Sequence, residues 1–381
     1  MANFMDYIEW RGDVDLKTSP LNEVDALILC HMEYNNIDNL VPTSFTKNGI
    51  TLRELAYRFA TAPDFLTRSD VGAMINPLTV NLLQAAGESV RFGSLKLCGY
   101  TNIIDTKREE QFSAVTYVLG DKSFFIAYRG TDDSIVGWKE DCDLGWKETV
   151  PSQQDALAYL EKASRHLRGD ILIGGHSKGG NLAVYAAANA GDKTKRRITS
   201  VFNNDGPGFK EGFFESEKYK SISSRTYTFV PQLSIVGMLF SHADDYVTVE
   251  SDERGLHQHD PFSWHVSAHH FVEKPDTDEQ SKVIGRTVNG WFNELSEENK
   301  EIFVKTIFGI LKDTDAKTNS ELTANWWNSI LKMLKAMKEL DPKTRDIIFK
   351  TVQLLFRCAG QTMFQEHAPR KSPAVKQVGK K

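Results

Sequence analysis

Residues 171–183 read ILIGGHSKGGNLA, which is an apolar strand-like run, a serine between glycines, and a run that favours a helix. Gly175 and Gly179 place Ser177 in a G-x-S-x-G spacing, which is typical of a sharp strand-to-helix turn that exposes a serine hydroxyl. A serine held at positive φ needs small neighbours on both sides, because the strand and the helix crowd together there. We interpret Ser177 as a nucleophile; the alternative is a glycine-rich turn with an idle serine.

Two other glycine-rich loops are excluded by their spacing. A phosphate-binding P-loop carries its lysine after the last glycine, whereas Lys178 precedes Gly179 and Gly180. The dinucleotide-binding fingerprint has a glycine at the position where His176 stands. A helix that starts after Ser177 would offer unpaired N–H groups and a positive dipole end beside the serine oxygen. The stretch therefore favours a nucleophilic serine over a nucleotide site.

Strand-like and helix-like segments alternate around this turn, which predicts a mostly parallel sheet covered by helices on both faces. Before the alternation, Gly120-Asp121 predicts a hairpin turn between two strands rich in valine, phenylalanine and tyrosine. The predicted elements after the hairpin are a helix over 152–167, a strand over 170–173, a helix over 177–190, a strand over 198–203, a helix over 211–220 and strands over 225–230 and 245–250. The fold class is therefore α/β.

Helical patterns flank this core on both sides. Thr51 precedes apolar residues at helical spacing and is a predicted N-cap, and Ser296 with two following glutamates predicts another helix start. Asp341-Pro342 begins a further predicted helix that ends at Gly360. The resulting division is an N-terminal helical region over 1–94, an α/β core over 95–275, a C-terminal helical region over 276–366 and a basic disordered tail over 367–381.

The composition argues against several classes of protein. The chain has 381 residues and a formal net charge of -5, a mildly acidic balance that gives no reason to expect nucleic-acid binding. Its four cysteines lack C-x-x-C spacing and predict reduced thiols. The first residues show no signal-peptide pattern, and no apolar run is long enough to cross a bilayer. We expect a soluble cytoplasmic protein.

Several stretches resemble lipases of the α/β-hydrolase fold. GGHSKGGNLA resembles the GHSLGG stretch of class-three lipases, and residues 127–146, AYRGTDDSIVGWKEDCDLGW, resemble their Arg-Gly-Thr…Trp…Asp stretch. YRGTDD, GHSKGGNLA, NNDGPGF and QHDPFSW resemble a bacterial family, the Mbeg-like α/β-hydrolase domains, over about residues 20–275. The resemblance implies that Ser177 is the nucleophile and that the backbone N–H groups of Thr131 and Lys178 form the oxyanion hole. Arg129 and Asp141 are expected to be structural, as an ion pair that shapes the loop.

The base should be a histidine after Ser177, since the triad of this fold follows the order serine, acid, histidine. Six histidines lie between Ser177 and the C-terminal helical region: His242, His257, His259, His265, His269 and His270. We favour His259 because it lies in a loop-like stretch after the last predicted strand, and in the QHDPFSW stretch of the resemblance. His265 and His242 are the alternatives.

The acid is predicted to be Asp205. It follows the predicted strand over 198–203 and precedes a Gly-Pro-Gly turn, a placement that can orient an imidazole. The lipase pattern puts the acid after the next strand, where this chain carries Ser234. Asp244 and Asp245 are therefore alternatives to Asp205, which could otherwise merely cap a turn.

No cofactor and no metal are expected from these motifs. His257, His259, Asp260 and His265 could in principle hold zinc, but no H-E-x-x-H pattern or cysteine pair supports such a site. Ordinary surface and core histidines explain the surplus more simply. The side chain of Lys178 is expected either to be solvated or to attract an anionic substrate.

The sequence thus predicts a lipase- or esterase-like serine hydrolase that cleaves acyl esters or thioesters through a Ser177 acyl-enzyme, with His259 and Asp205 as its partners. The expected substrate is a small-molecule or lipid acyl ester. One alternative is a catalytically inactive binding module of the same fold, which the serine at position 234 favours. Another is a membrane-surface interaction module, because the predicted helix over 325–340 has an apolar side and a lysine side; packing of that helix on the core is the preferred interpretation.

Overall fold

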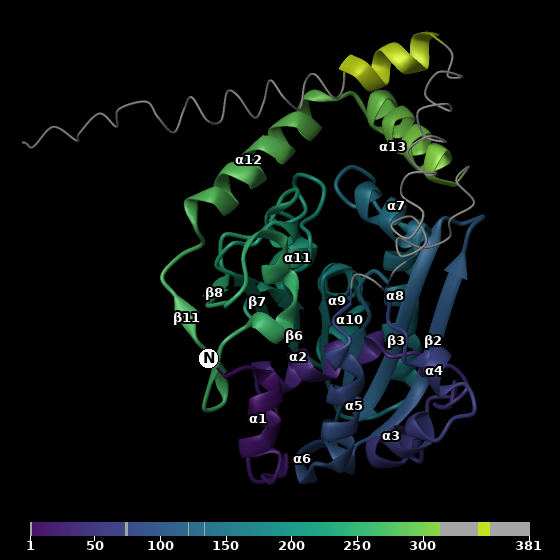
Figure 1. Ribbon diagram of the computed structural model, residues 1–381, viewed down its shortest axis with the longest axis vertical. Coiled ribbons are helices and arrows are strands. Elements are labelled where there is room, and N and C mark those ends of the chain that lie inside the picture. The colour runs from purple at the N-terminus through teal and green to yellow at the C-terminus, as the bar shows by residue number, and fades with distance from the viewer. Residues whose placement is uncertain (1, 73–74, 121, 133, 313–341, 351–381) are drawn as a thin grey trace, which may run out of the picture.

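One mixed sheet forms the centre of the computed structural model, which describes residues 2–72, 75–120, 122–132, 134–312 and 342–350 (Figure 1). Among these residues the sheet has nine strands in the order β1-β2-β3-β4-β5-β6-β7-β8-β11, close to their order in the chain. The strands are β1 Ile50–Thr51, β2 Lys96–Asp105, β3 Glu110–Val118, β4 Ser123–Tyr128, β5 Asp170–His176, β6 Ile198–Asn204, β7 Thr226–Pro231, β8 Val247–Val249 and β11 Glu273–Lys274.

The parallel character predicted for the sheet is found only in part. Strands β4 to β8 pair parallel, whereas β1 to β4 and the β8–β11 pair are antiparallel. The difference follows from the connections: the short turn at Gly120, with φ +105°, joins β3 to β4 as a hairpin, whereas β4 to β7 are joined by longer connections that contain helices. The predicted hairpin is therefore confirmed, and it belongs to an antiparallel half that the alternating pattern did not include.

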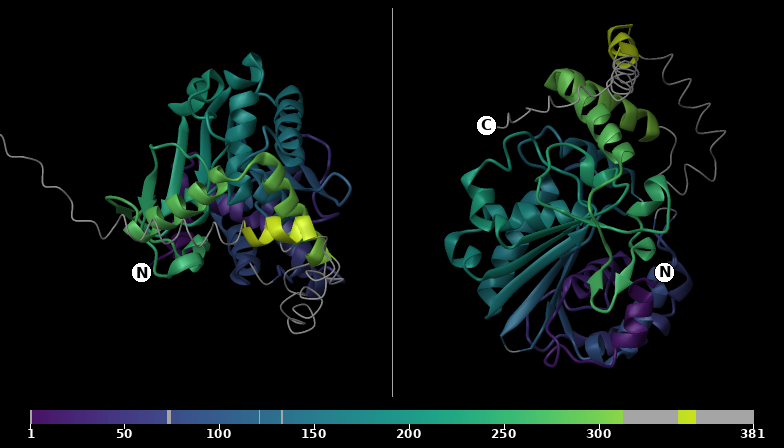
Figure 2. Two further views of the ribbon diagram at one scale, coloured as in Figure 1. Left: turned by 90° about the horizontal axis from the view of Figure 1, so that it is seen from above. Right: turned by 90° about the vertical axis from the view of Figure 1, so that its left-hand side faces the viewer.

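Helices cover both faces of the sheet. Along β4, Phe125 and Ala127 pack with the N-terminal helices, while Phe124, Ile126 and Tyr128 pack with the helices of the other face, as the period of two in a strand requires. Figure 2 shows the two helical layers on opposite sides of the sheet. The first layer comprises α1 Phe4–Arg11, α2 Glu23–His31, η1 Met32–Tyr34, α3 Leu52–Ala60, α4 Phe65–Arg68, α5 Leu78–Glu88 and α6 Val90–Gly93. The second comprises α8 Pro151–His166, α9 Lys178–Asn189, α10 Asp192–Lys195 and α11 Glu217–Ser223.

Several predicted helix boundaries can be compared with the structure. Thr51 caps α3 by accepting a hydrogen bond from the N–H of Glu54, as predicted. The helix predicted over 211–220 starts later, at Glu217, because Gly212 turns at φ +86° and Ser216 provides the N-cap. The predicted helix over 325–340, the helix end at Gly360 and the predicted tail over 367–381 lie outside the described residues.

Three helices lie at the carboxyl end of the parallel strands (Figure 1). They are α7 Ile135–Asp143, α12 Glu279–Glu294 and α13 Glu297–Lys312. Helix α13 packs on α7, and α12 packs on η2 Val236–Met238, which follows β7. Ser296 precedes α13 and accepts a hydrogen bond from the N–H of Asn299, so the helix start predicted there is confirmed. Within the described part of the chain, no helix has both the length and the apolar character that a membrane crossing needs.

Candidate active site

Ser177 occupies a strained turn between a strand and a helix. Strand β5 ends at His176 and α9 starts at Lys178, and between them Ser177 has φ +57° and ψ -135°. Its N–H donates to the carbonyl of Asn204 over 3.0 Å, and its own carbonyl accepts from the N–H of Gly180 over 2.9 Å. The Ser177 hydroxyl has no hydrogen-bond partner among the described residues. The backbone is thus fixed while the side chain is left unengaged.

The glycines around Ser177 allow this turn to form. A Cβ atom on Gly175 would lie 2.0 Å from the carbonyl carbon of Gly179, and one on Gly179 would lie 2.1 Å from the carbonyl oxygen of Tyr128. Any larger residue would collide with backbone, because the start of α9 packs directly on the ends of β4 and β5. The crowding predicted from the G-x-S-x-G spacing is present.

His259 and Asp205 meet beside this turn. The Nδ1 atom of His259, at the end of η3 Gly255–His259, lies 2.6 Å from Oδ2 of Asp205. Asp205 follows β6, is fully buried and has φ +51°. A carboxylate accepts, so Nδ1 carries the proton and donates; the lone pair of His259 is therefore on Nε2. This is the tautomer that a general base for a serine hydroxyl requires.

Asp205 is held by two further donors, both outside the predicted site residues. Its Oδ1 atom accepts from the hydroxyl of Ser234 over 2.5 Å and from the N–H of Gly237 over 3.2 Å. Ser234, which departs from the lipase pattern, therefore donates to the predicted acid, Asp205. The sequence did contain a hint of this role, because a small polar residue, Ser234, stands where the lipase pattern has a carboxylate. Asp244 and Asp245, the alternative acids, are exposed, and in the described part of the chain neither forms a hydrogen bond or an ion pair with His259.

Ser177 and His259 are neighbours without a direct hydrogen bond. The imidazole of His259 lies over that of His176, the residue before Ser177, with 4.6 Å between the ring centres and 32° between the planes. No hydrogen bond between Ser177 Oγ and His259 Nε2 is present among the described contacts. Bonds of this kind often form only when substrate is bound. The structure thus brings Ser177, His259 and Asp205 together, but Ser177 Oγ and His259 Nε2 are not hydrogen-bonded.

The two predicted oxyanion donors also lie at the turn. The Lys178 N–H is one of the unpaired donors at the start of α9, and neither it nor the Thr131 N–H has an acceptor among the described residues. A Cβ atom on Gly130 would lie 3.0 Å from the Ser177 Cβ, so the loop that carries Thr131 rests against the serine. The Thr131 hydroxyl donates to Oδ2 of Asp141 over 2.5 Å, which anchors this loop. Burial raises the pKa of Asp141 to about 6.

The prediction that the Lys178 side chain is solvated or attracts an anionic substrate is wrong. The side chain is fully buried and points away from solvent, with Nζ 3.0 Å from a carboxylate oxygen of Glu140 and 2.8 Å from the carbonyl oxygen of Gln111. Helix α7 supplies Glu140 and β3 supplies Gln111, so the lysine joins α9 to both. It neither lies in solvent nor faces a substrate.

The predicted ion pair between Arg129 and Asp141 is also wrong. Arg129 pairs with Asp132 over 3.0 Å and donates to the Asn102 side chain over 3.0 Å. Asp141 instead accepts from Thr131. Arg129 and Asp141 therefore both hold the loop that carries Thr131, but each does so through a different partner.

The other candidate histidines serve elsewhere. His265 is buried with its Nε2 2.7 Å from an Asp252 oxygen, and Nδ1 of His242 lies 3.2 Å from the carbonyl oxygen of Ala243. His257 is exposed. Across the described ranges, no group of three or more His, Cys, Asp and Glu side chains is arranged to hold a metal ion.

Comparison with known proteins identifies one matching family. The family model described as Mbeg1-like matches residues 86–309, which confirms the family resemblance. No curated protein sequence matches the chain.

Three solved lipase structures are similar to parts of the chain. The M37 lipase is 16% identical, covers 58% of this chain and 70% of its own, and has a TM-score of 0.35. A lipase propeptide complex from Rhizomucor miehei is 16% identical over 61% and 83%, with a TM-score of 0.33. A fungal lipase–inhibitor complex is 14% identical over 52% and 77%, with a TM-score of 0.33.

Proposed function

We propose that this chain, which belongs to the Mbeg1-like family, is a serine hydrolase that cleaves acyl esters through a covalent acyl-enzyme on Ser177. One observation carries the proposal: a fully buried Asp205 orients His259 over a 2.6 Å hydrogen bond, beside a serine held at φ +57°. Strain of this kind in a non-glycine residue costs of order 1–3 kcal/mol, and such residues cluster at active sites.

In the proposed first step, Ser177 Oγ attacks the carbonyl carbon of the ester while His259 Nε2 takes its proton. Asp205 stabilises the imidazolium through Nδ1–H, and the N–H groups of Thr131 and Lys178 bind the oxyanion. His259 then returns the proton to the leaving alcohol, and the C–O bond of the ester breaks. In the second step His259 Nε2 takes a proton from water, and the resulting hydroxide attacks the acyl carbon. The bond between that carbon and Ser177 Oγ then breaks, His259 returns the proton to Oγ, and the carboxylic acid is released.

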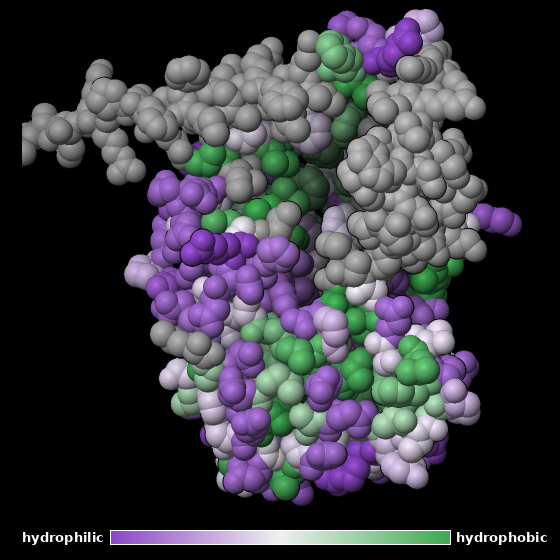
Figure 3. Space-filling view, in the orientation of Figure 1, coloured by the Kyte–Doolittle hydropathy of each residue, from purple (hydrophilic) through white to green (hydrophobic). Residues whose placement is uncertain are grey.

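An apolar acyl group fits the surroundings of the site. The surface beneath α12 is hollowed, and apolar side chains border the hollow (Figure 3). Helix α12 packs on η2, whose Gly237 binds Asp205, so this surface belongs to the same end of the sheet. Aromatic packing holds α12 in place: the ring centres of Phe292 and Phe240 lie 5.4 Å apart, and those of Trp291 and Phe303 lie 5.6 Å apart. The apolar border of the hollow supports an acyl ester as the substrate class.

The test is covalent labelling with a fluorophosphonate probe, which reacts with activated serines. We expect wild type to be labelled, Ser177→Ala to be unlabelled and His259→Ala to be labelled at least about 100-fold more slowly. Ser164→Ala is the matched control, because it removes a serine hydroxyl on α8 that binds Thr194 over 3.0 Å, far from the site. A folded wild-type protein that resists the probe would favour the inactive binding module instead. Turnover of p-nitrophenyl esters of increasing acyl length would then test the substrate class.

A further inference from the structure

A second hydrogen-bonded chain reaches His259 at its backbone carbonyl, whereas Asp205 contacts its ring. Nε2 of the buried His176 lies 2.9 Å from the backbone carbonyl oxygen of His259, and Nδ1 of His176 lies 3.1 Å from the hydroxyl of Tyr34. A carbonyl can only accept, so the proton of His176 is on Nε2 and its Nδ1 lone pair accepts from Tyr34. The direction is thus defined throughout: Tyr34 donates to His176, and His176 donates to the His259 backbone.

His176 suits this role because it stays neutral. Burial, together with His259 and His31 nearby, lowers the pKa of His176 well below its usual value. A neutral imidazole has one donor and one acceptor, which match its two partners. Protonation of His176 would break the bond from Tyr34 and place a second positive charge beside His259 just when the proposed reaction makes that ring cationic.

Tyr34 comes from a part of the chain outside the family match, which starts at residue 86. It ends η1, directly after α2, and α2 packs against β4, β5 and β6 on the face opposite α9. A Cβ atom on Gly130 would lie 2.1 Å from the Tyr34 hydroxyl and 2.6 Å from the carbonyl oxygen of His176. The hydroxyl therefore lies between the loop that carries Thr131 and the turn that carries Ser177.

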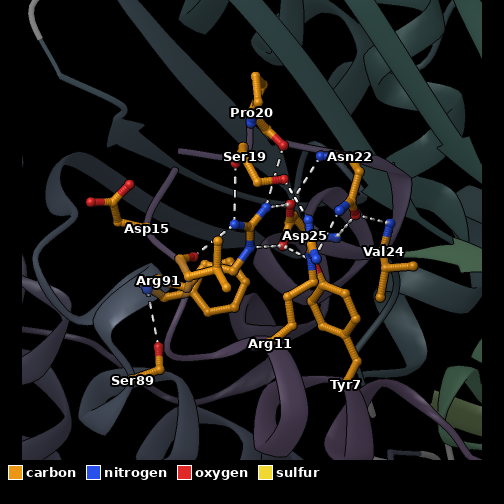
Figure 4. Close-up of polar contacts among 12 residues, drawn as sticks. Tyr7, Arg11, Asp15, Ser19, Pro20, Asn22, Val24, Asp25, Ser89 and Arg91 are labelled. Atoms are coloured by element: carbon orange, nitrogen blue, oxygen red, sulfur yellow. Dashed lines mark hydrogen bonds and ion pairs between the residues drawn. The ribbon is translucent and has the colours of Figure 1, made fainter. Parts of the chain in front are cut away.

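The helix that presents Tyr34 is firmly attached. Figure 4 shows Arg91 of α6 in contact with Asp25 of α2, and both side chains are fully buried. Arg91 Nε donates to Asp25 Oδ1 over 2.6 Å, and Arg91 Nη1 donates to the carbonyl of Val14 over 2.9 Å. The hydroxyl of Tyr7 also donates to Asp25, over 2.8 Å. Helix α2 is thereby tied to α1 and α6, which limits how far Tyr34 can move.

The residues after His259 are held by the same N-terminal segment. The side-chain amide of Asn3 donates to the carbonyl of Phe262 over 3.0 Å, and the N–H of Val266 donates to the carbonyl of Ala2 over 2.9 Å. The stretch that carries His259 is thus anchored at its start through His176 and Tyr34 and further along by residues 2 and 3.

From these contacts we infer that Tyr34 and His176 are positioning residues that hold the His259 backbone so that its Nε2 faces Ser177, and that the N-terminal segment thereby completes the site. The inference rests on the proposed function, because the value of a fixed imidazole lies in the proton transfer from Ser177. Neither side chain takes part in bond making; each acts through His259.

The kinetic test compares variants in the hydrolysis of p-nitrophenyl acetate. Tyr34→Phe removes one hydrogen bond, and we expect kcat to fall about ten-fold with KM within about two-fold. His176→Phe keeps a ring over His259 but loses both bonds, and we expect a fall of about 100-fold. His176→Gln should recover much of this loss, because its side-chain amide can donate to the His259 carbonyl. The matched control is Thr79→Val, which removes a hydroxyl partner, at 3.1 Å, of the neighbouring buried His31, and it should leave kcat unchanged.

A second readout separates this inference from the proposed function. The Nδ1 proton of His259, bonded to Asp205, is observable by proton NMR without any substrate. We expect its resonance to shift or broaden in Tyr34→Phe and His176→Phe and to stay in place in Thr79→Val. An unchanged resonance in both site variants overturns the inference whatever their activity. A shifted resonance in a protein whose Ser177 ignores fluorophosphonate supports the positioning role and overturns the proposed function alone.

Discussion

Replacement of Asp205 by asparagine tests the site most directly, because the structure determines which way the new amide must point. The N–H of Gly237 is a fixed backbone donor 3.2 Å from Oδ1. An NH₂ group at that position would oppose it, so the amide oxygen faces Gly237 and the NH₂ group faces His259. The Ser234 hydroxyl can rotate to suit either arrangement and does not reverse this choice.

The consequence is a change of tautomer in His259. With an NH₂ group 2.6 Å away, Nδ1 has to accept, so the proton moves to Nε2, which can no longer take a proton from Ser177. In enzymes with a Ser-His-Asp triad, this substitution lowers kcat about 10⁴-fold, or about 5 kcal/mol of barrier. We expect Asp205→Asn to lower kcat by about 10³- to 10⁴-fold with little change in KM.

The assay is steady-state hydrolysis of a p-nitrophenyl ester, with circular dichroism to verify that the variant is folded. Asp244→Asn and Asp245→Asn are matched controls, because they make the same change at exposed alternative acids, and both should retain wild-type rates. A loss below about ten-fold in Asp205→Asn would refute the tautomer argument. A large loss of kcat in either control would indicate that Asp244 or Asp245 is the acid instead.

Three further predictions concern buried ionisable groups and are measured by urea unfolding. Lys178→Met leaves the carboxylate of Glu140 buried without its cation and should cost about 3–5 kcal/mol. Glu140→Gln in the double variant should restore only part of this loss, because both Glu140 oxygens accept backbone N–H groups, from Gln111 and Ser152, and the amide NH₂ group must oppose one of them; additive losses would contradict this. Burial raises the pKa of Glu33 from 4.5 to about 8, so the stability it contributes is complete below pH 4.5 and is lost as the pH rises through 8. Glu33→Gln should therefore remove on the order of 4 kcal/mol from the difference in unfolding free energy between about pH 5 and about pH 9, and an unchanged difference would refute the assignment. Arg91→Met strips Asp25 of its buried partner and should cost about 3–5 kcal/mol; a loss below about 1 kcal/mol would show that the pair is dispensable.

The features predicted well from the sequence are those encoded by short spacings. The turn at Ser177 follows from glycines two residues to either side, and the N-cap at Thr51 follows from the helical pattern after it. The meeting of His259 and Asp205 was also anticipated, because Asp205 follows one parallel strand and His259 lies in a loop after the last one, so both lie at the same edge of the sheet. Their catalytic roles stay proposals.

The features that were missed depend on partners far away in the chain. The direction of the Lys178 side chain is decided by Glu140, 38 positions earlier, which no local pattern connects to it. Tyr34 reaches His176 across 142 positions. Of the antiparallel part of the sheet, only the hairpin of β3 and β4 was predicted, because the alternating pattern of strands and helices describes only β4 to β8, whereas β1 and β2 precede it.

The hydrogen bond between Asn3 and Phe262 spans 259 positions and has a consequence for how the chain folds. As the chain leaves the ribosome, α1 and α2 emerge long before residues 261–271, which pack on part of each helix, so that part of their surface stays uncovered through most of synthesis. Contacts of such high sequence separation slow folding and leave intermediates prone to aggregation. The contacts of residues 2 and 3 with the stretch after His259 form only once Phe262 and Val266 have emerged. Nascent chains stalled earlier would therefore be prone to aggregation and would lack the complete site.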